Sequence, residues 1–343
     1  MRVLVVKLSS LGDVVHAMPA VQDLCSAIPG VEVDWVVEGA FAPLVERCVG
    51  VGKVIPCALR RWRKNPWHAQ TRTEWAAFRN ALQEQAYDAV LDLQGLTKSA
   101  LVAWMARTTP QGRRFAMANR TDGSAFEAPT RWVADVAIPL ESHVHAVARA
   151  RMLCAQALGY ALPQTLTYGL QPGGLAVVPK PPVGAPVNPF APRKSFVALV
   201  HGTSRADKQW PLENWVAIGK CLNLAGFSVA LAHGSSAEKT TSEAIAAKLQ
   251  EAWVWPTMGL DALTDTMAKC AGVVGVDSGL SHIAVALGLP HVQIYNFDTA
   301  WRTGPDNAST DTTHQCSVTG SPHPDVQTVW QAWVRLDTPL LCQ

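Results

Sequence analysis

The sequence has 343 residues, of which 48% are hydrophobic and 16% are charged, and its formal net charge is +2. This length favours about two domains over one. The small net charge excludes the polybasic field that suits non-specific nucleic-acid binding, so we expect no nucleic-acid partner. The eight cysteines form no C-x-x-C pair, which disfavours both a zinc site and a dense disulfide framework. The sequence shows neither a signal peptide nor a run of about 18 apolar residues, so we expect a cytoplasmic globular protein.

Short apolar runs alternate with longer amphipathic segments over the first half of the chain. The apolar run at 2–8 precedes an amphipathic segment at 12–28, and the run at 86–95 precedes another at 97–107. This alternation predicts an α/β fold with a parallel sheet.

The pattern breaks at 171–195, which is rich in proline and glycine and is typical of a linker. Alternation then resumes until a helical pattern near the end of the chain. We expect two similar α/β domains with a cleft between the carboxyl ends of their two sheets, where ligands of open α/β sheets bind. The expected parts are a first domain at 1–170, a linker at 171–195, a second domain at 196–320 and a closing helix at 321–343.

The turn after the first apolar run allows two interpretations. Ser10 and Asp13 have the spacing of a capping box, which would occupy the carboxylate at the start of a helix. Alternatively, Gly12 lets a ligand approach the backbone and Asp13 acts as a general base at the end of a strand. The two roles compete for one carboxylate, and the residues alone leave both open.

Two strand ends in the second half carry polar residues. Thr203, Ser204 and Lys208 lie between a strand and a helix, which indicates either a phosphate site or a solvated loop. Asp277 ends a second strand, and the helix that follows could offer its first amides to an anion. A carboxylate would repel a diphosphate, so we expect Asp277 to accept from sugar hydroxyls or to brace the loop.

A basic cluster lies at 60–64, where four cations alternate with Trp62. They cannot share one face of a strand or a helix, so the pattern predicts a loop. That loop is either solvated or captures a phosphorylated or carboxylated substrate, because arginine forks match such groups. Gln94 and Lys98 follow another strand end in the same half.

Several segments together resemble the ADP-heptose:lipopolysaccharide heptosyltransferases. They are VKLSSLGDVVHAMPAV, IPCALRRWRK, YDAVLDLQGLTKSA, HGTSRADKQWP and VDSGLSHIAVALG. The resemblance implies a GT-B fold, in which two Rossmann-like α/β domains face each other across a central cleft. It implies inverting transfer of L-glycero-D-manno-heptose from ADP-heptose to Kdo of Kdo-lipid A. It also implies that no metal or other cofactor is required and that the enzyme works at the cytoplasmic face of the inner membrane, where we expect a monomer.

RRWRK and QGLTKSA favour the members that add heptose directly to Kdo. The alternatives are a member that acts on an already heptosylated acceptor, a GT-B-like nucleotide-sugar epimerase, or a nucleotide-binding regulatory module.

The resemblance also assigns roles to individual residues. It makes Asp13 the catalytic base. It places the diphosphate on Thr203, Ser204 and Lys208, the ribose on Glu238, and the adenine on Met258. It makes Asp277 the acceptor for heptose hydroxyls. The amides at the helix terminus come from Ser278, Gly279, Leu280 and Ser281, and His282 is also on the donor side. The acceptor side falls to Ser10, Gly12, Arg60, Arg61, Arg63, Lys64, Gln94, Lys98 and Arg120.

Overall fold

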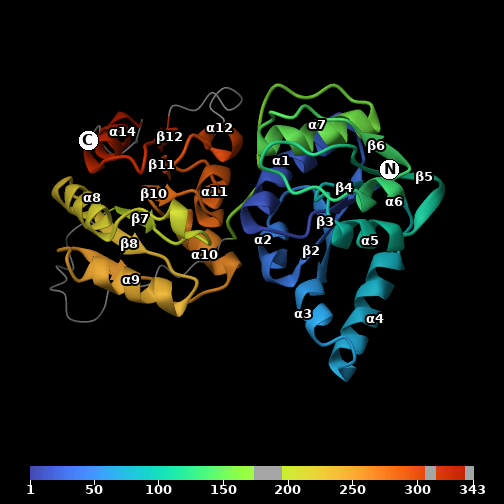
Figure 1. Ribbon diagram of the computed structural model, residues 1–343, viewed down its shortest axis with the longest axis horizontal. Helices are drawn as coiled ribbons and strands as arrows, with labels where there is room; N and C mark the ends of the chain where they lie inside the picture. The colour runs from blue at the N-terminus through green and yellow to red at the C-terminus, as the bar shows by residue number, and fades with distance from the viewer. Residues whose placement is uncertain (174–194, 306–313, 337–343) are drawn as a thin grey trace. The chain divides into compact units, whose positions relative to one another are not determined.

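The computed structural model describes residues 1–173, 195–305 and 314–336, and the chain divides into two units, Met1–Gln171 and Pro172–Gln343 (Figure 1). Most of the expected linker, at 174–194, and the last residues of the expected closing segment lie outside the described residues. In each unit, helices flank a central sheet. No helix in the described ranges is both long and apolar enough to cross a membrane. Each cysteine that the structure describes is a free thiol.

The sheet of the first unit has six parallel strands in the order β3-β2-β1-β4-β5-β6. The strands are β1 (Arg2–Val6), β2 (Glu32–Glu38), β3 (Val51–Cys57), β4 (Tyr87–Asp92), β5 (Thr108–Met117) and β6 (Val136–Ile138). The chain winds from β1 to one edge and then returns to the other side of β1 through β4. The carboxyl ends of β1 and β4 therefore form the switch point at which ligands of such sheets bind.

Helices cover both faces of this sheet (Figure 1), which explains why the central strand β1 contains an unbroken buried apolar run at residues 3–6. Leu4 and Val6 of β1 share a core cluster with Phe78 and Leu82. The side chains of Val3 and Val5 point to the opposite face of the sheet and are also fully buried. The helices and 3₁₀ segment are α1 (Leu11–Ala27), η1 (Gly39–Phe41), α2 (Ala42–Val45), α3 (Leu59–Lys64), α4 (Ala69–Gln83), α5 (Thr97–Met105), α6 (Pro129–Val133) and α7 (Ala146–Leu158).

The second unit repeats this strand order around β7, as β12-β11-β10-β7-β8-β9, again with parallel pairing throughout. The strands are β7 (Phe196–Val200), β8 (Ser228–Leu231), β9 (Ala252–Val254), β10 (Gly272–Val276), β11 (His291–Tyr295) and β12 (Gln315–Thr319). The switch point lies between β7 and β10. The expectation of two parallel α/β domains is confirmed.

The helical pattern near the end of the chain is α14 (Val326–Arg335), which packs against α8, β11 and β12. Val329 and Trp333 are buried in the core. A Cβ atom at Gly272 would lie only 2.6 Å from the Trp333 ring, so glycine at the start of β10 makes room for α14. The other helical segments of this unit are η2 (Ala206–Lys208), α8 (Leu212–Leu224), α9 (Ser236–Ala246), α10 (Leu260–Met267), α11 (Gly279–Ala286) and α12 (Ala300–Thr303).

A buried ion pair joins α1 to α7 in the first unit. Arg151 donates to both carboxylate oxygens of Asp23, at 2.7 and 3.0 Å, and also to the carbonyls of Pro163 and Thr165. The two side chains are only 6% and 5% exposed. This geometry satisfies both charges, whereas the loss of one partner would leave the other charge buried and unpaired.

We expect Arg151→Met to lower the free energy of unfolding by about 3–5 kcal/mol, because it leaves the Asp23 carboxylate buried without its cation. The measurement is urea denaturation followed by circular dichroism. The control is Lys53→Met, which breaks the exposed pair with Glu84 and should cost about 1 kcal/mol or less. An equal loss in both variants would contradict the role given to burial.

Candidate functional site

The carboxyl ends of β1 and β4 meet in a network of hydrogen bonds. The Gln94 side-chain oxygen accepts from the amides of Leu8 and Ser9, at 3.0 and 3.1 Å. Asp92 in turn accepts from the Gln94 amide at 2.9 Å, and burial raises the pKa of Asp92 to about 6. Gln94, which the resemblance places on the acceptor side, therefore holds the loop between β1 and α1 in position.

Asp13 forms the expected capping contacts with Ser10. The Ser10 amide and hydroxyl donate to Oδ2 of Asp13 at 3.1 and 2.8 Å, while Oδ1 lies 3.7 Å from Nζ of Lys7. Burial raises the pKa of Asp13, but the Lys7 charge and the Ser10 hydrogen bonds outweigh it, so the pKa lies below the ordinary 3.8. The side chain is still 38% exposed. The carboxylate is therefore ionised, oriented and accessible, and the cap fixes its position without closing it off.

Lys7 is a site residue that our sequence analysis missed. Its Nζ donates to the carbonyl of Leu93 at 3.0 Å, and its side chain is 7% exposed. Burial lowers the pKa of Lys7, and the nearby Asp13 charge opposes that shift. The available signal was a lysine directly after the apolar run at residues 3–6. Arg149 of α7 was also missed, although its charge contributes to the low pKa of Asp13.

The prediction of a loop at 60–64 is wrong, because these residues belong to α3 (Leu59–Lys64). Trp62 is 7% exposed and packs edge-on against Trp75, with ring centroids 5.5 Å apart. Burial of this one ring anchors the short helix, while the cations project from its other sides. The four cations do not share one face of α3, as expected. The segment is helical nevertheless, because Trp62 alone supplies its buried face.

The cations of the basic cluster separate into different environments. Arg60 and Lys98 both donate to the Ser9 hydroxyl, at 3.4 and 3.1 Å, which brings them to the end of β1. Arg61 instead pairs with Glu74 at 2.5 Å. Arg63 lines a cavity beside Lys98. Of the other expected acceptor residues, Lys64 and Arg120 are exposed, and Gly12 lies in the first turn of α1.

The second unit has its own polar cluster at the ends of β7 and β10. Nζ of Lys208 lies 2.5 Å from Oδ2 of Asp277, and Nε2 of His282 lies 3.3 Å from Oδ1. Burial raises the pKa of Asp277, but the hydrogen bonds and charges of His282 and Lys208 outweigh it and hold the pKa far below its usual range. Of the two expectations for Asp277, the structure shows the bracing one. Contact with a sugar hydroxyl stays a prediction.

The first turn of α11 follows this cluster. Ser278 occupies the N-cap position, as expected, but its buried hydroxyl makes no capping hydrogen bond and has no partner in the described part of the chain. Ser281 donates inward to the carbonyl of Val276 at 2.6 Å. Gly279 and Leu280 begin the helix. The amides of this turn are therefore the groups that an anion could reach.

The remaining expected donor residues come from three segments of the second unit, after β7, at the start of α9 and before α10. The Thr203 hydroxyl donates to the Asp277 carbonyl at 3.4 Å, and Ser204 is exposed. Glu238 accepts from the Gly234 amide at 2.6 Å at the start of α9, and a Cβ at Gly202 would lie 2.8 Å from its carboxyl group. The half-buried Met258 accepts a weak hydrogen bond from Thr266 at 3.8 Å. The structure brings Glu238 to the end of β7, and its contact with a ribose stays a prediction.

Comparison with curated proteins places these clusters in a family context. The chain is 39% identical over 296 residues to lipopolysaccharide heptosyltransferase 1 of Pseudomonas aeruginosa, which covers 86% of this chain and 78% of that protein. It is 27% identical over 311 residues to lipopolysaccharide heptosyltransferase 2 of Escherichia coli, which covers 86% of this chain and 82% of that one.

Solved structures agree. E. coli heptosyltransferase WaaC with ADP matches at a TM-score of 0.81 and 31% identity, covering 96% of this chain and 98% of that one. The same enzyme with ADP-2-deoxy-2-fluoro heptose matches at 0.77 and 33%, with the same coverage. The two units thus have a GT-B type fold. A family model described as glycosyltransferase family 9 (heptosyltransferase) matches residues 75–330. On this evidence the chain belongs to glycosyltransferase family 9, the heptosyltransferases.

Proposed function

We propose that this heptosyltransferase moves L-glycero-D-manno-heptose from ADP-heptose to Kdo of Kdo-lipid A in the lipopolysaccharide inner core. The observation that carries the proposal is the ionised Asp13 in the first turn of α1, with Arg60 and Lys98 both donating to the Ser9 hydroxyl just beyond β1. The greater identity to heptosyltransferase 1, 39% against 27% for heptosyltransferase 2, supports Kdo as the acceptor. An already heptosylated acceptor is the second candidate.

In this proposal Asp13 is the general base. The acceptor hydroxyl must lose a proton as it attacks the anomeric carbon, and the ionised carboxylate of this partly exposed side chain can accept it. General-base assistance of this kind contributes about 100- to 10,000-fold to the rate. The Ser10 cap and Lys7 prevent the carboxylate from rotating away or protonating at neutral pH.

The leaving diphosphate gains charge as the bond to the anomeric carbon breaks. Lys208, the Thr203 and Ser204 hydroxyls and the amides at the start of α11 supply the stabilisation in our proposal, with no metal required. Asp277 orients Lys208 through an ion pair of 2.5 Å, and His282 shares the same carboxylate. A diphosphate would thus meet a carboxylate whose charge is already compensated.

The proposed acceptor is an anionic lipid, so the enzyme has to meet it at a membrane surface. We propose a cytoplasmic monomer that binds peripherally to the inner membrane. The cations Arg63 and Lys64 and the 88% exposed Trp67 support this, since basic and aromatic side chains favour an anionic interface.

The experiment that tests the function is ADP release from ADP-heptose with and without Kdo-lipid A, with mass spectrometry of the lipid. Acceptor-dependent release and one added heptose are the expected results. Transfer only to a heptosylated lipid would indicate the second candidate. Release that needs no acceptor would favour an epimerase, and no release with either lipid would leave a nucleotide-binding module.

We expect Asp13→Asn to lower kcat by about 100- to 10,000-fold, because the amide cannot accept the proton while it can still accept from Ser10. Asp325→Asn makes the same change at the N-cap of α14, where Asp325 accepts from the Thr328 amide at 2.7 Å, and should leave kcat unchanged. Thermal denaturation of both variants accompanies the assay. If Asp13→Asn lost stability but kept its turnover, Asp13 would be only a cap.

We expect Lys7→Gln to move the acidic limb of the kcat/KM profile to higher pH. The base works only when ionised, and removal of the Lys7 charge leaves burial to raise the pKa of Asp13. Activity is therefore lost at a higher pH on acidification. Lys7→Arg keeps the charge and should keep the limb in place. A uniformly lower rate with an unmoved limb would give Lys7 a structural role only.

We expect Lys208→Met to raise the Kd for ADP by about 10- to 100-fold, the usual effect of losing a charged hydrogen bond, with the acceptor KM unchanged. Isothermal titration calorimetry measures the Kd. Lys220→Met removes the same charge from an exposed position on α8 and should leave the Kd unchanged. Wild-type ADP affinity in Lys208→Met would rule out the assigned role.

A further inference from the structure

A cavity of about 770 Å³ opens between α3, α4 and α5 of the first unit. Its volume is within the range of small-molecule sites, about 300–1,000 Å³. The walls are apolar: Leu59 and Trp62 come from α3, Pro66 from the turn after it, Trp75 from α4 and Leu101 from α5. The functions assigned so far to the strand ends do not use these side chains.

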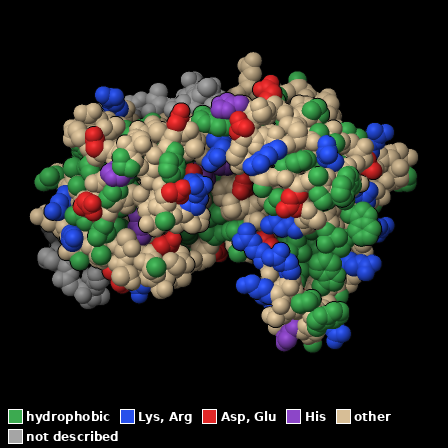
Figure 2. All heavy atoms as spheres, in the orientation of Figure 1, with side chains coloured by type: hydrophobic (Ala, Val, Ile, Leu, Met, Phe, Trp, Pro, Cys, Tyr) green, Lys and Arg blue, Asp and Glu red, His purple; other side chains and the backbone are tan. Residues whose placement is uncertain are grey.

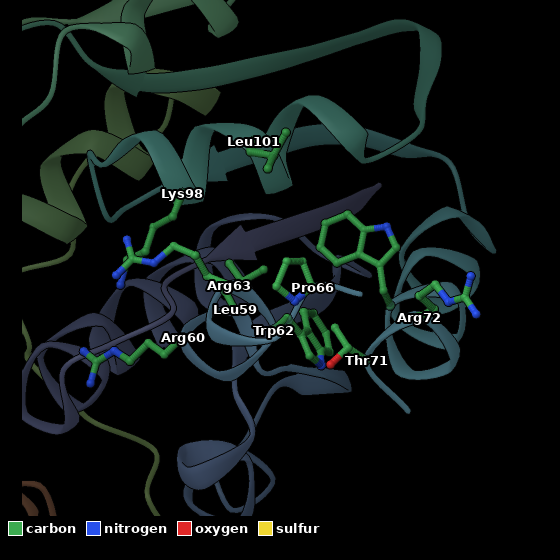
Figure 3. Close-up of a pocket in the computed structure, with 10 residues that line it drawn as sticks. Leu59, Arg60, Trp62, Arg63, Pro66, Thr71, Arg72, Lys98 and Leu101 are labelled. Atoms are coloured by element: carbon green, nitrogen blue, oxygen red, sulfur yellow. The ribbon is translucent and has the colours of Figure 1, made fainter. Parts of the chain in front are cut away.

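The polar groups of the cavity gather at one end. In Figure 3 the charged groups of Arg60, Arg63 and Lys98 lie together on one side, Leu59, Trp62 and Pro66 occupy the middle, and Arg72 points outward at the far side. Among the described residues that line the cavity, none is acidic. Two nearby carboxylates lie outside this lining: Glu74 accepts from the Trp62 indole, and burial raises the pKa of Glu38 although Arg60 and Lys98 oppose the shift. Figure 2 shows the same contrast, with Lys and Arg beside α3 and hydrophobic side chains towards α4 and α5.

The cationic end of the cavity continues into the site at the end of β1. Arg60 and Lys98 line the cavity and also donate to the Ser9 hydroxyl, at 3.4 and 3.1 Å. Lys98 and Leu101 are three residues apart on α5, so they share one face of the helix. A molecule bound along this face would meet charge beside the reacting site and hydrocarbon further from it.

The apolar wall is rigid enough to be a binding surface. The Trp62 and Trp75 rings pack at 87° with Phe78 5.5 and 5.9 Å from them, and the Trp62 indole donates to Glu74 at 2.7 Å. Glu74 also forms an ion pair with Arg61, which does not line the cavity. An open apolar surface with a cationic rim matches an anionic head attached to an alkyl chain.

We propose that this cavity binds one acyl chain of the lipid acceptor while its cations bind the adjoining anionic group. The proposal rests on the function proposed above, because it identifies the acceptor as an amphiphile that is held by its tail as well as its sugar. A preformed apolar slot would draw the chain out of the bilayer and bring the sugar to Asp13 in one orientation. Each methylene buried there would contribute to affinity.

The direct test uses dodecyl phosphate below its micelle concentration, with inorganic phosphate as the headgroup alone, in titration calorimetry. We expect the wild-type protein to bind dodecyl phosphate at least about 100-fold more tightly than phosphate. Leu101→Gln should weaken dodecyl phosphate binding about tenfold and leave phosphate binding unchanged. Leu101 is 44% exposed, so this variant should fold normally.

The matched control is Leu162→Gln, because Leu162 is 41% exposed and does not line the cavity. It should bind dodecyl phosphate as the wild type does. Equal affinities for dodecyl phosphate and phosphate, or equal losses in the two variants, would overturn the proposal. Loss of binding to anionic vesicles by Leu101→Gln, with dodecyl phosphate binding intact, would also overturn it and indicate contact with a bilayer surface.

Kinetics give a second readout. Leu101→Gln should raise the KM for an acylated Kdo acceptor relative to the KM for the same acceptor with its acyl chains removed. An equal rise for both acceptors would place the sugar in the cavity and contradict the proposal. If the wild-type protein transferred heptose to neither acceptor, the proposed function would fail, while the calorimetry would still decide whether the cavity binds an alkyl chain.

Discussion

The buried Lys7 at the end of β1 is the constraint on which the first unit's site depends. Its ammonium group has almost no access to water, so it has to be satisfied by the protein. The Leu93 carbonyl beyond β4 and the Asp13 carboxylate on α1 provide that satisfaction. One desolvated charge therefore ties two neighbouring strands and the first helix together, and it sets the ionisation of the proposed base at the same time.

The second unit also contains a buried charge at its switch point, but this charge is negative. There the buried charge is the Asp277 carboxylate, and the Lys208 ammonium group and the His282 ring lie against its two oxygens. In each unit a buried charged residue directly follows a strand at the switch point: Lys7 follows β1 in the first unit, and Asp277 follows β10 in the second. The shared strand order puts each of these ions where an open α/β sheet accepts a ligand, so the repeated topology explains why both clusters lie at equivalent places.

Much of this architecture could be predicted from the sequence because it follows from periodicity. Alternating apolar runs and amphipathic segments indicated both parallel sheets, and Ser10 with Asp13 indicated the cap that the structure contains. Partnerships between distant residues left no such pattern: Asp23 and Arg151 are 128 positions apart, and Lys208 and Asp277 are 69 apart. The helix α3 was missed for a different reason. We expected the cations of a helix to share one face, but that expectation holds for long helices and fails for six residues around one buried ring.

Because α14 packs on the sheet of the second unit, that unit can complete its core only after α14 has been synthesised. The first unit has its whole sheet once Ile138 has been made, and α7 completes its cover by Leu158. The core of the second unit waits for Trp333, which fills the space left by Gly272. Domains generally fold in the order in which the ribosome delivers them. The first unit, with the proposed base, would therefore be complete well before the second, and the apolar face of β10 beside Gly272 would stay uncovered until α14 docks.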